Sequence, residues 1–129
     1  MVTFTPRTGM LERLAELVNG DPWLVRRGRF VDTTFLIEAG AAQYLIDIHA
    51  GRIEHVASGP FVMPRWTFAL RAPEEAWSQF RKALPPPGFN DILAMLKSRT
   101  LRIEGDQHVL MANLLYFKDV LAKMREVRA

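Results

Sequence analysis

The sequence predicts an α+β fold in which five strands form one antiparallel sheet with helices packed on it. Three observations indicate this fold. Four segments between residues 30 and 71 are rich in β-branched and aromatic residues and are separated by turns that contain glycine. Residues 74–96 and 106–125 have the apolar spacing of amphipathic helices. A fifth short strand, residues 100–104, separates these two helical regions.

The N-terminal part of the chain is expected to form a helix over residues 8–19. Leu11, Leu14 and Val18 share one face, and Asn19-Gly20 is a typical helix end. The residues from Asp21 onward are expected to form a loop that leads to the first strand.

The expected strands occupy residues 30–38, 43–49, 52–58 and 65–71. A two-residue turn at Ala50-Gly51 fixes the register of the second and third strands. This register places His55 opposite Ile46, on the apolar face of the sheet. There His55 is either a histidine satisfied by a local hydrogen bond or a polar anchor for the head group of a ligand.

The fourth strand is expected to place Trp66, Phe68 and Leu70 on one face. Trp66 is interpreted as part of the core or of a pocket wall. Pro73 then suits the first position of a helix, because proline lacks the N–H that would be unpaired there.

The second half of the chain is punctuated by a proline-rich break at residues 85–88. Asn90 is expected to cap a short helix after this break, and Asp106 is expected to cap the last helix, which runs to about Arg125. The break is either a rigid connector or the edge of a lid, with Phe89 resting on the mouth of a cavity.

The last helix raises a functional question because its first three turns are apolar on almost every side. A surface helix of a small domain needs one apolar stripe. The stripe through Leu110, Leu114 and Phe117 is covered by the sheet, but Met111 and Leu115 lie outside it. Three explanations for the burial of this additional apolar surface remain open: further core packing, a lipid-like ligand, or the surface of another protein chain.

The composition narrows the function classes. The 129 residues fit one domain, and the 49% hydrophobic and 24% charged content is ordinary for a globular protein. The lack of cysteine excludes disulfides, thiolate metal sites and a cysteine nucleophile. No phosphate-binding loop, metal-ligand spacing or nucleophile elbow is present, so we expect no enzymatic activity, cofactor or metal. The chain has no signal-like or membrane-spanning run and is expected to be cytoplasmic.

The positive charge is concentrated in arginine rather than lysine, 13 residues against 4, with a net charge of +3. This excess is too small to indicate nucleic-acid binding, and we expect no nucleic-acid partner. The densest cluster is Arg26, Arg27 and Arg29. It is either a solvated turn or a transient contact with the anionic surface of a membrane.

Three stretches of the chain together resemble the sterol carrier protein-2 (SCP2) domain. They read FLIEAGAAQYLIDIHAGRIEHVASG for a strand and hairpin, WTFALRAPEEAW for a strand that leads into a helix, and LRIEGDQHVLMANL for the last strand and helix. The resemblance covers roughly residues 30–120. Its most specific part is the RIEGD junction.

The resemblance implies a mainly antiparallel sheet with helices on one face around an apolar tunnel. Such domains carry or present fatty acids, acyl-CoA thioesters, sterols or isoprenoid and quinone intermediates. We therefore expect a non-enzymatic lipid-binding protein, monomeric or homodimeric. The alternative is an assembly protein whose C-terminal helix forms a homodimer or docks on a lipid-biosynthetic enzyme. The expected lining comprises Phe35, Ile37, Tyr44, Ile46, His55, Phe68, Trp77, Phe80, Phe89, Met95, Leu110, Met111, Leu114 and Phe117.

Overall fold

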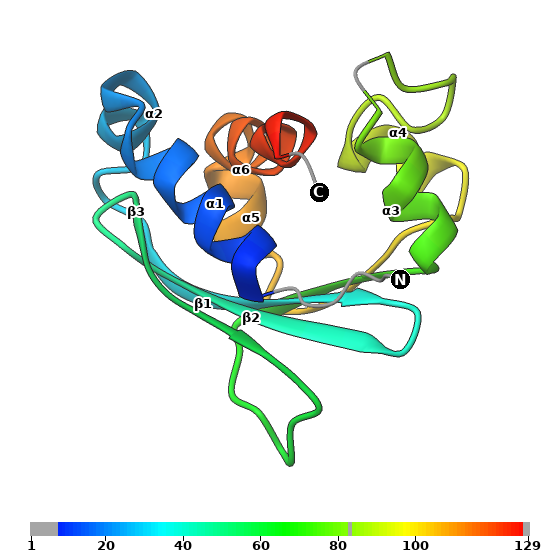
Figure 1. Ribbon diagram of the computed structural model, residues 1–129, viewed down its shortest axis with the longest axis horizontal. Coiled ribbons are helices and arrows are strands. Elements are labelled where there is room, and N and C mark those ends of the chain that lie inside the picture. The colour runs from blue at the N-terminus through cyan, green and yellow to red at the C-terminus, as the bar shows by residue number, and fades with distance from the viewer. Residues whose placement is uncertain (1–7, 83, 128–129) are drawn as a thin grey trace.

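The sheet is built from two successive hairpins and a pair of strands beside them. The computed structural model describes residues 8–82 and 84–127 of the chain. Its strands are β1 (Asp32–Ala39), β2 (Ala42–His49), β3 (Arg52–Ser58), β4 (Phe68–Ala72) and β5 (Arg102–Gly105). They lie side by side in the order β3-β2-β1-β4-β5 (Figure 1). The predicted α+β fold with five strands is confirmed.

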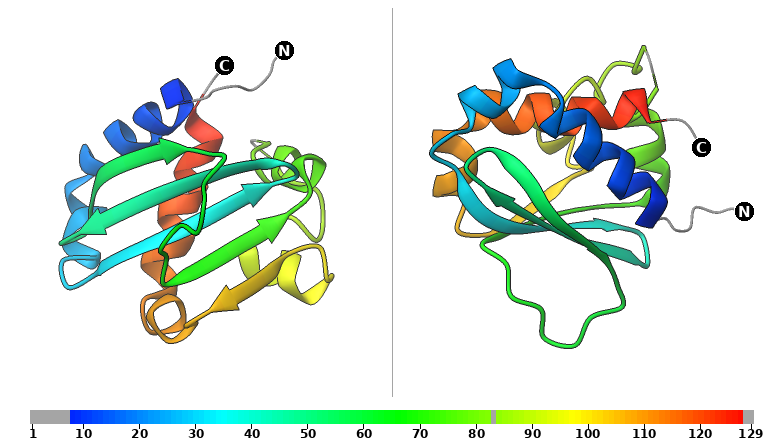
Figure 2. Two further views of the ribbon diagram at one scale, coloured as in Figure 1. Left: turned by 90° about the horizontal axis from the view of Figure 1, so that it is seen from below. Right: turned by 60° about the vertical axis from the view of Figure 1, so that its left-hand side comes forward.

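The pairing of β1 with β4 is parallel, whereas the other strand pairs are antiparallel. Because β3 lies at one edge and β4 lies on the far side of β1, the chain must cross the sheet between them. Residues 59–67 make this crossing over one face, which we call the outer face (Figure 2). The opposite, inner face is covered by helices.

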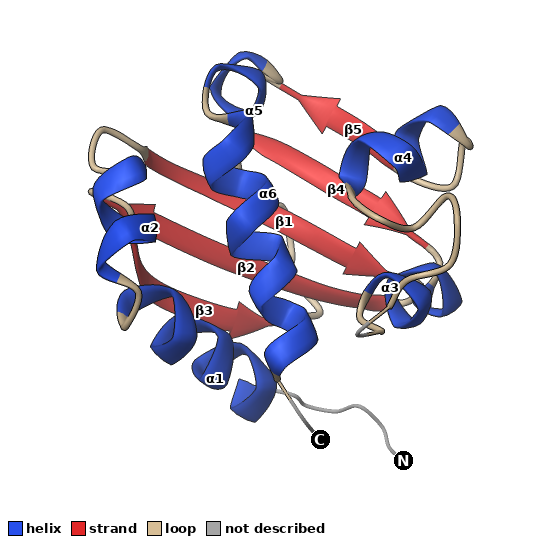
Figure 3. Cartoon of the chain, turned by 90° about the horizontal axis from the view of Figure 1, so that it is seen from above, coloured by secondary structure: helices blue, strands red, loops and turns tan. Residues whose placement is uncertain are grey.

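The helices lie on the inner face in two groups (Figure 3). They are α1 (Thr8–Asn19), α2 (Pro22–Arg27), α3 (Glu74–Phe80), α4 (Ile92–Lys97), α5 (His108–Ala112), α6 (Leu114–Ala122) and the 3₁₀ turn η1 (Lys123–Glu126). The helix α1 packs along β3, α6 crosses the middle of the sheet, α3 lies at the end of β1, and α4 lies near β4 and β5 (Figures 1 and 3). None of the described helices is long and apolar enough to cross a membrane.

The edge strand β3 is held to α1 by a side-chain amide. Asn19 Nδ2 donates to the carbonyl oxygen of Ile53 at 3.0 Å, and the N–H of Ile53 donates to Asn19 Oδ1 at 2.8 Å. Asn19, expected only as a helix end, therefore pairs with a strand in the manner of a neighbouring backbone.

The expected register of β3 is wrong beyond Ile53. Ile48 pairs with Ile53 as predicted, but a bulge follows, so His55 pairs with Asp47 and Val56 pairs with Ile46. A bulge adds one residue to one strand, and one extra residue moves every later side chain to the other face. His55 is consequently exposed on the outer side, and Val56 takes the inner position.

The expected face of Trp66 is also wrong. The strand β4 begins at Phe68, so Trp66 precedes it and does not follow its alternation. Its ring lies 5.7 Å from the guanidinium carbon of Arg71, whose strand position faces outward together with Glu38. Only Phe68 and Leu70 of the expected trio point inward.

Two helical predictions need correction. The residues after Asp21 form α2 instead of a loop: Asp21 Oδ1 accepts the N–H of Leu24 at 3.2 Å, and Pro22 occupies the first turn. The final helix is interrupted at Asn113, whose side chain donates to the carbonyl of Val109 at 3.0 Å. That local bond competes with the helical ladder and separates α5 from α6.

The cap of α4 is displaced by one residue. Asp91, rather than Asn90, accepts the N–H of Ala94 at 2.9 Å. Asp106 takes the role expected of it at the last helical region, because its side chain accepts the N–H of His108 at 3.0 Å.

Candidate functional site

The expected lining residues gather on the inner face and are mostly buried there. Ten of the fourteen are buried: Phe35, Ile37, Tyr44, Ile46, Phe68, Trp77, Phe80, Met95, Leu110 and Phe117. Phe89 and Leu114 are partly buried and pack against this cluster. Met111 lies at its rim with 41% of its surface exposed. His55 is separated from the set by the bulge in β3.

Three aromatic rings occupy the space between the centre of the sheet and α6. Phe35 and Phe68 stack with centroids 5.1 Å apart, and Phe117 meets both edge-on at 5.7 and 5.3 Å. These separations are those of favourable ring pairs. The centre of the inner face is thus filled by side chains, and a ligand bound there must move or flank these rings.

The polar groups at the border of this region bond to the backbone. The indole N–H of Trp77 donates to the carbonyl of Glu38 at 2.9 Å, and the hydroxyl of Tyr116 donates to the carbonyl of Gly51 at 2.7 Å. Burial raises the pKa of the Tyr116 hydroxyl, which therefore stays protonated. Among the described residues, Thr33 Oγ1 is the buried side-chain oxygen that lacks a hydrogen-bond partner.

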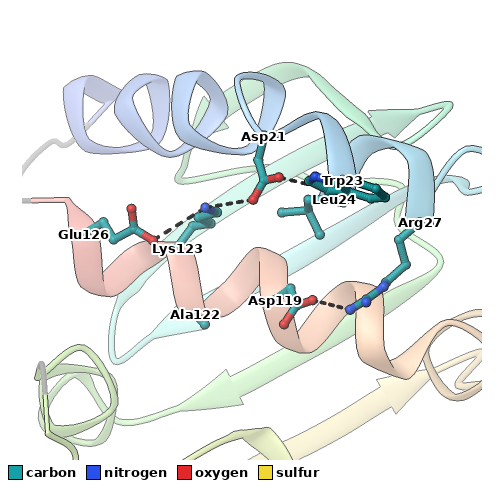
Figure 4. A pocket seen from close by; sticks show the side chains of 8 residues that line it. All are labelled: Asp21, Trp23, Leu24, Arg27, Asp119, Ala122, Lys123 and Glu126. Carbon is teal, nitrogen blue, oxygen red and sulfur yellow. Dashed lines mark hydrogen bonds and ion pairs between the residues drawn. The ribbon is translucent and has the colours of Figure 1, made fainter.

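A hollow of about 340 Å³ lies between α2 and α6 (Figure 4). Its wall carries alternating charges: Arg27 bonds to Asp119 at 2.5 Å, and Lys123 bonds to Asp21 at 3.0 Å. Its apolar part consists of Trp23, Leu24 and Ala122. We call this space the α2–α6 hollow.

The charges in the α2–α6 hollow stabilise each other. The hydrogen bond from Lys123 and the N–H of Leu24 hold the pKa of Asp21 below its usual value. Partial burial alone would lower the pKa of Lys123, but Asp21 and Glu126 together outweigh it and the pKa is raised. Both side chains are therefore charged near neutral pH.

A second hollow of about 440 Å³ lies between α1 and the edge strand β3. Its lining includes Ala15 of α1 and His55, with Glu12, Glu16 and Glu54 around them. We call it the α1–β3 hollow. Within residues 8–82 and 84–127, no group of acidic and histidine side chains is arranged to hold a metal ion.

Two exposed aromatic residues, which sequence reasoning missed as surface features, precede and follow the arginine cluster in the chain. Trp23 is 80% exposed and Phe30 is 83% exposed. The guanidinium carbon of Arg29 lies 4.7 Å from the centre of the Phe30 ring. The sequence signal for this surface is Asp21-Pro22, which is a helix start. In the helix that follows it, α2, Trp23 and Arg27 are four residues apart and therefore lie on one face.

The fold defined by this sheet and its helices is that of an SCP2-like domain, as the resemblance predicted. A crystal structure of sterol carrier protein 2 superposes with a TM-score of 0.78 at 11% identity, over 95% of this chain and 98% of that one. A solution structure of a protein from Thermus thermophilus, described as possibly a sterol carrier protein, gives 0.74 at 14% identity over 100% and 92%. A protein described as UbiJ-SCP2 ubiquinone synthesis protein gives 0.60 at 15% identity over the whole of both chains.

These likenesses concern structure. A scan against protein-family models gives no match, and neither does a search of curated protein sequences. The predicted fold is therefore shown by the path of the chain, while the ligand and the lining residues stay predictions.

Proposed function

We propose that this protein binds a lipid-like molecule on the inner face of its sheet and carries it without chemical change. The observation that carries the proposal is the superposition on sterol carrier protein 2 over nearly the whole of both chains. The buried inner face supplies an apolar surface of matching chemistry. Fatty acids, acyl-CoA thioesters, sterols and isoprenoid or quinone intermediates are the proposed ligand classes.

The proposed ligand lies between the sheet and the helices, beside the ring cluster of Phe35, Phe68 and Phe117. Transfer of apolar surface out of water contributes about 25 cal/mol per Å² before the costs of association. The adaptable side chains of Met95 and Met111 suit ligands of different shape. His55 is not part of this proposal, because the bulge turns it away from the inner face.

The first test is native mass spectrometry of the purified protein, followed by extraction and identification of any bound molecule. A stoichiometric lipid or quinone supports the proposal. A bare protein that also fails to bind added fatty acid, acyl-CoA and quinone analogues contradicts it.

A second test uses two neighbouring residues of β1. Ile37 points to the inner face and Leu36 to the outer face, and both are fully buried. Ile37→Ala removes apolar contacts of about 0.8 kcal/mol per methylene and should weaken fatty-acid binding about tenfold. The matched control, Leu36→Ala, should leave affinity unchanged. Equal losses in both variants would point to general destabilisation instead of ligand contact.

We further propose that Arg26, Arg27 and Arg29 touch an anionic membrane surface during transfer. Exposed Trp23 and Phe30 favour this interpretation, since aromatic side chains flanked by arginine suit the interface of a bilayer. Co-sedimentation with phosphatidylglycerol-containing vesicles tests it. Arg26→Glu with Arg29→Glu should abolish binding, and Arg102→Glu, on β5, should not.

The alternative function is assembly through the C-terminal helices. Leu115 is 63% exposed and lies on α6 near partly exposed Met111 of α5. An apolar patch of this kind favours contact with another protein chain. If this apolar patch forms a homodimer, Leu115→Glu will convert the dimer to a monomer, as measured by sedimentation velocity. A wild-type protein that is already monomeric would exclude the homodimer.

A further inference from the structure

The hydroxyl of Thr33 is enclosed in the interior with its hydrogen-bonding capacity unused. Only 8% of the residue is exposed, and within residues 8–82 and 84–127 its Oγ1 has no hydrogen-bond partner. The next residue, Thr34, lies on the opposite face of β1 and donates to Asp47 at 2.9 Å. A buried hydroxyl without a partner costs free energy, and such groups are rare in folded proteins. Thr33 therefore calls for an explanation that Thr34 does not need.

The position of Thr33 places it at the border of the ring cluster. Side chains alternate along a strand, so Thr33 shares the inner face with Phe35, about 7 Å further along β1. Phe35 stacks on Phe68 and meets the edge of Phe117. The proposed ligand lies beside these three rings. A polar group at the end of that ligand is then within reach of the Thr33 hydroxyl.

The surroundings of Thr33 are uncharged. Its partner across the strand pair is Ile48, which is fully buried. The adjacent carboxylate, Asp32, belongs to the outer side and forms an exposed pair with His49 at 2.6 Å. Among the described residues, no charged residue is buried, so an anion drawn into the interior finds no cation beside it. Because an unpaired buried charge is far more costly than a buried neutral group, the oxygen that suits Thr33 is a neutral one.

We propose that Thr33 is the internal anchor for an uncharged oxygen of the ligand, either a carbonyl or a hydroxyl. A threonine hydroxyl donates to a carbonyl oxygen, and it donates to or accepts from another hydroxyl. This inference rests on the proposed function as a lipid carrier and narrows its ligand classes. It favours sterols and quinone intermediates over fatty acids, whose carboxylate gains nothing from Thr33 because it stays in contact with water.

The test compares three probes of equal chain length, which are dodecanol, dodecanone and dodecanoate. Their affinities are measured at neutral pH by isothermal titration calorimetry for the wild type and three variants. Thr33→Val keeps the shape of the side chain but removes its hydroxyl, whereas Thr33→Ser keeps the hydroxyl. Thr34→Val is the matched control, because it removes a hydroxyl from the outer face of the same strand.

The anchor predicts that Thr33→Val weakens the binding of dodecanone, dodecanol or both about tenfold, since the lost hydrogen bond is one to a group already removed from water. Its affinity for dodecanoate should not change. Thr33→Ser and Thr34→Val should bind all three probes as the wild type does. A loss confined to dodecanone would assign the anchor to a quinone-type carbonyl, and a loss confined to dodecanol would assign it to a sterol-type hydroxyl.

The melting temperature of the ligand-free protein separates an anchor from a structural hydroxyl. Thr33→Val should raise this temperature, because it replaces an unpaired buried polar group by an apolar one of the same shape. The variant should thus gain stability while it loses affinity for the neutral probes. If Thr33→Val does not fold by circular dichroism, Thr33→Ala removes the same hydroxyl and is measured against Thr33→Ser.

Two outcomes would overturn the anchor and leave the carrier function intact. One is an affinity of Thr33→Val for both neutral probes equal to that of the wild type. The other is a lower melting temperature of Thr33→Val, which would show that the hydroxyl is bonded in the ligand-free protein. A wild type that binds none of the three probes would overturn the carrier proposal itself, and the anchor with it.

Discussion

The inner face of the sheet is covered by helices, whereas the outer face is crossed by the extended segment 59–67 (Figure 2). Both faces nevertheless bury side chains of β1 completely. Phe35 and Ile37 are buried on the inner side, and Leu36 is buried on the outer side beside Ala69 of β4. The inner face is apolar throughout its centre, but the outer face combines this apolar strip with charges.

The charges of the outer face form one connected group. Arg71 donates to Glu38 at 2.5 Å and to Glu104 at 2.8 Å, and the ring of Trp66 lies against its guanidinium. Since Arg71 and Glu38 are only about a fifth exposed, their attraction is less screened than that of a surface pair. The comparison teaches that the continuous apolar run Phe35-Leu36-Ile37 gives this central strand buried side chains on both faces of the sheet.

The largest expected effect concerns the inner face. Phe117→Ala removes the ring that contacts both Phe35 and Phe68 and should lower the free energy of unfolding by about 3–5 kcal/mol. Urea denaturation followed by circular dichroism measures it. A loss below about 1 kcal/mol would mean that the cluster collapses around the cavity or is loosely packed in solution.

The next effect tests whether the outer face is a true part of the core. Leu36→Ala should cost about 2–3 kcal/mol, because the side chain is enclosed although it lies opposite the helices. The control is Leu84→Ala, since Leu84 is 90% exposed and should change stability by less than about 0.5 kcal/mol. Similar small losses for both would show that Leu36 is not enclosed on the outer face in solution.

A smaller effect is expected from the charged group. Arg71→Met leaves Glu38 and Glu104 without their shared cation and should cost about 1–2 kcal/mol, measured by thermal unfolding at low salt. Arg102 is the matched control, because it is 70% exposed and 3.6 Å from Glu104. Arg102→Met should cost less than about 0.5 kcal/mol. Equal effects would place the Arg71 group in the class of solvated surface pairs.

The smallest effect concerns the polar contacts that hold the helices over the inner face. The pKa of Asp21 is lowered by Lys123. Burial would raise the pKa of Asp91, but the N–H of Ala94 and the ammonium of Lys118 outweigh it and lower that pKa. A carboxyl whose folded pKa lies below its usual 3.8 stabilises the fold at higher pH and loses that contribution as the pH falls through the folded pKa.

The melting temperature should therefore decline as the pH falls below about 4. Asp21→Asn and Asp91→Asn should lower the melting temperature at neutral pH and reduce its further decline in acid. Differential scanning calorimetry across this range measures both. A decline of the same size in the double variant would assign the acid sensitivity to other carboxylates.

The fold could be predicted from the sequence because its strands and helices follow simple periodicities. The hairpin turn at Ala50-Gly51 and the helix start near Pro73 are local signals, and the structure contains both, although Pro73 is the N-cap and Glu74 is the first helical residue. The bulge after Ile53 has no such signal, since His55 and Val56 each fit a strand. The placement of His55 therefore depended on an assumption of regular pairing, and that assumption fails.

The candidate sites likewise include one region that the sequence predicts and one that it does not. The buried members of the expected lining are apolar residues of periodic segments, so their position on the inner face was predictable. The α2–α6 hollow joins residues about 100 positions apart, such as Trp23 and Lys123, and no local pattern brings them together. The start of α2 was the exception, because Asp21-Pro22 is a helix-start signal that we interpreted as a loop.

The amide of Asn19 has a consequence for the behaviour of the protein at high concentration. An unpaired edge strand is a template on which another molecule can add its own strand, and such additions propagate into aggregates. By engaging both backbone groups of Ile53, Asn19 occupies the place that an intruding strand would need at the start of β3. At the opposite edge, β5 is only four residues long and carries Arg102 and Glu104. Both margins of the sheet thus resist the addition of a further strand, which favours a protein that stays dispersed when it is concentrated.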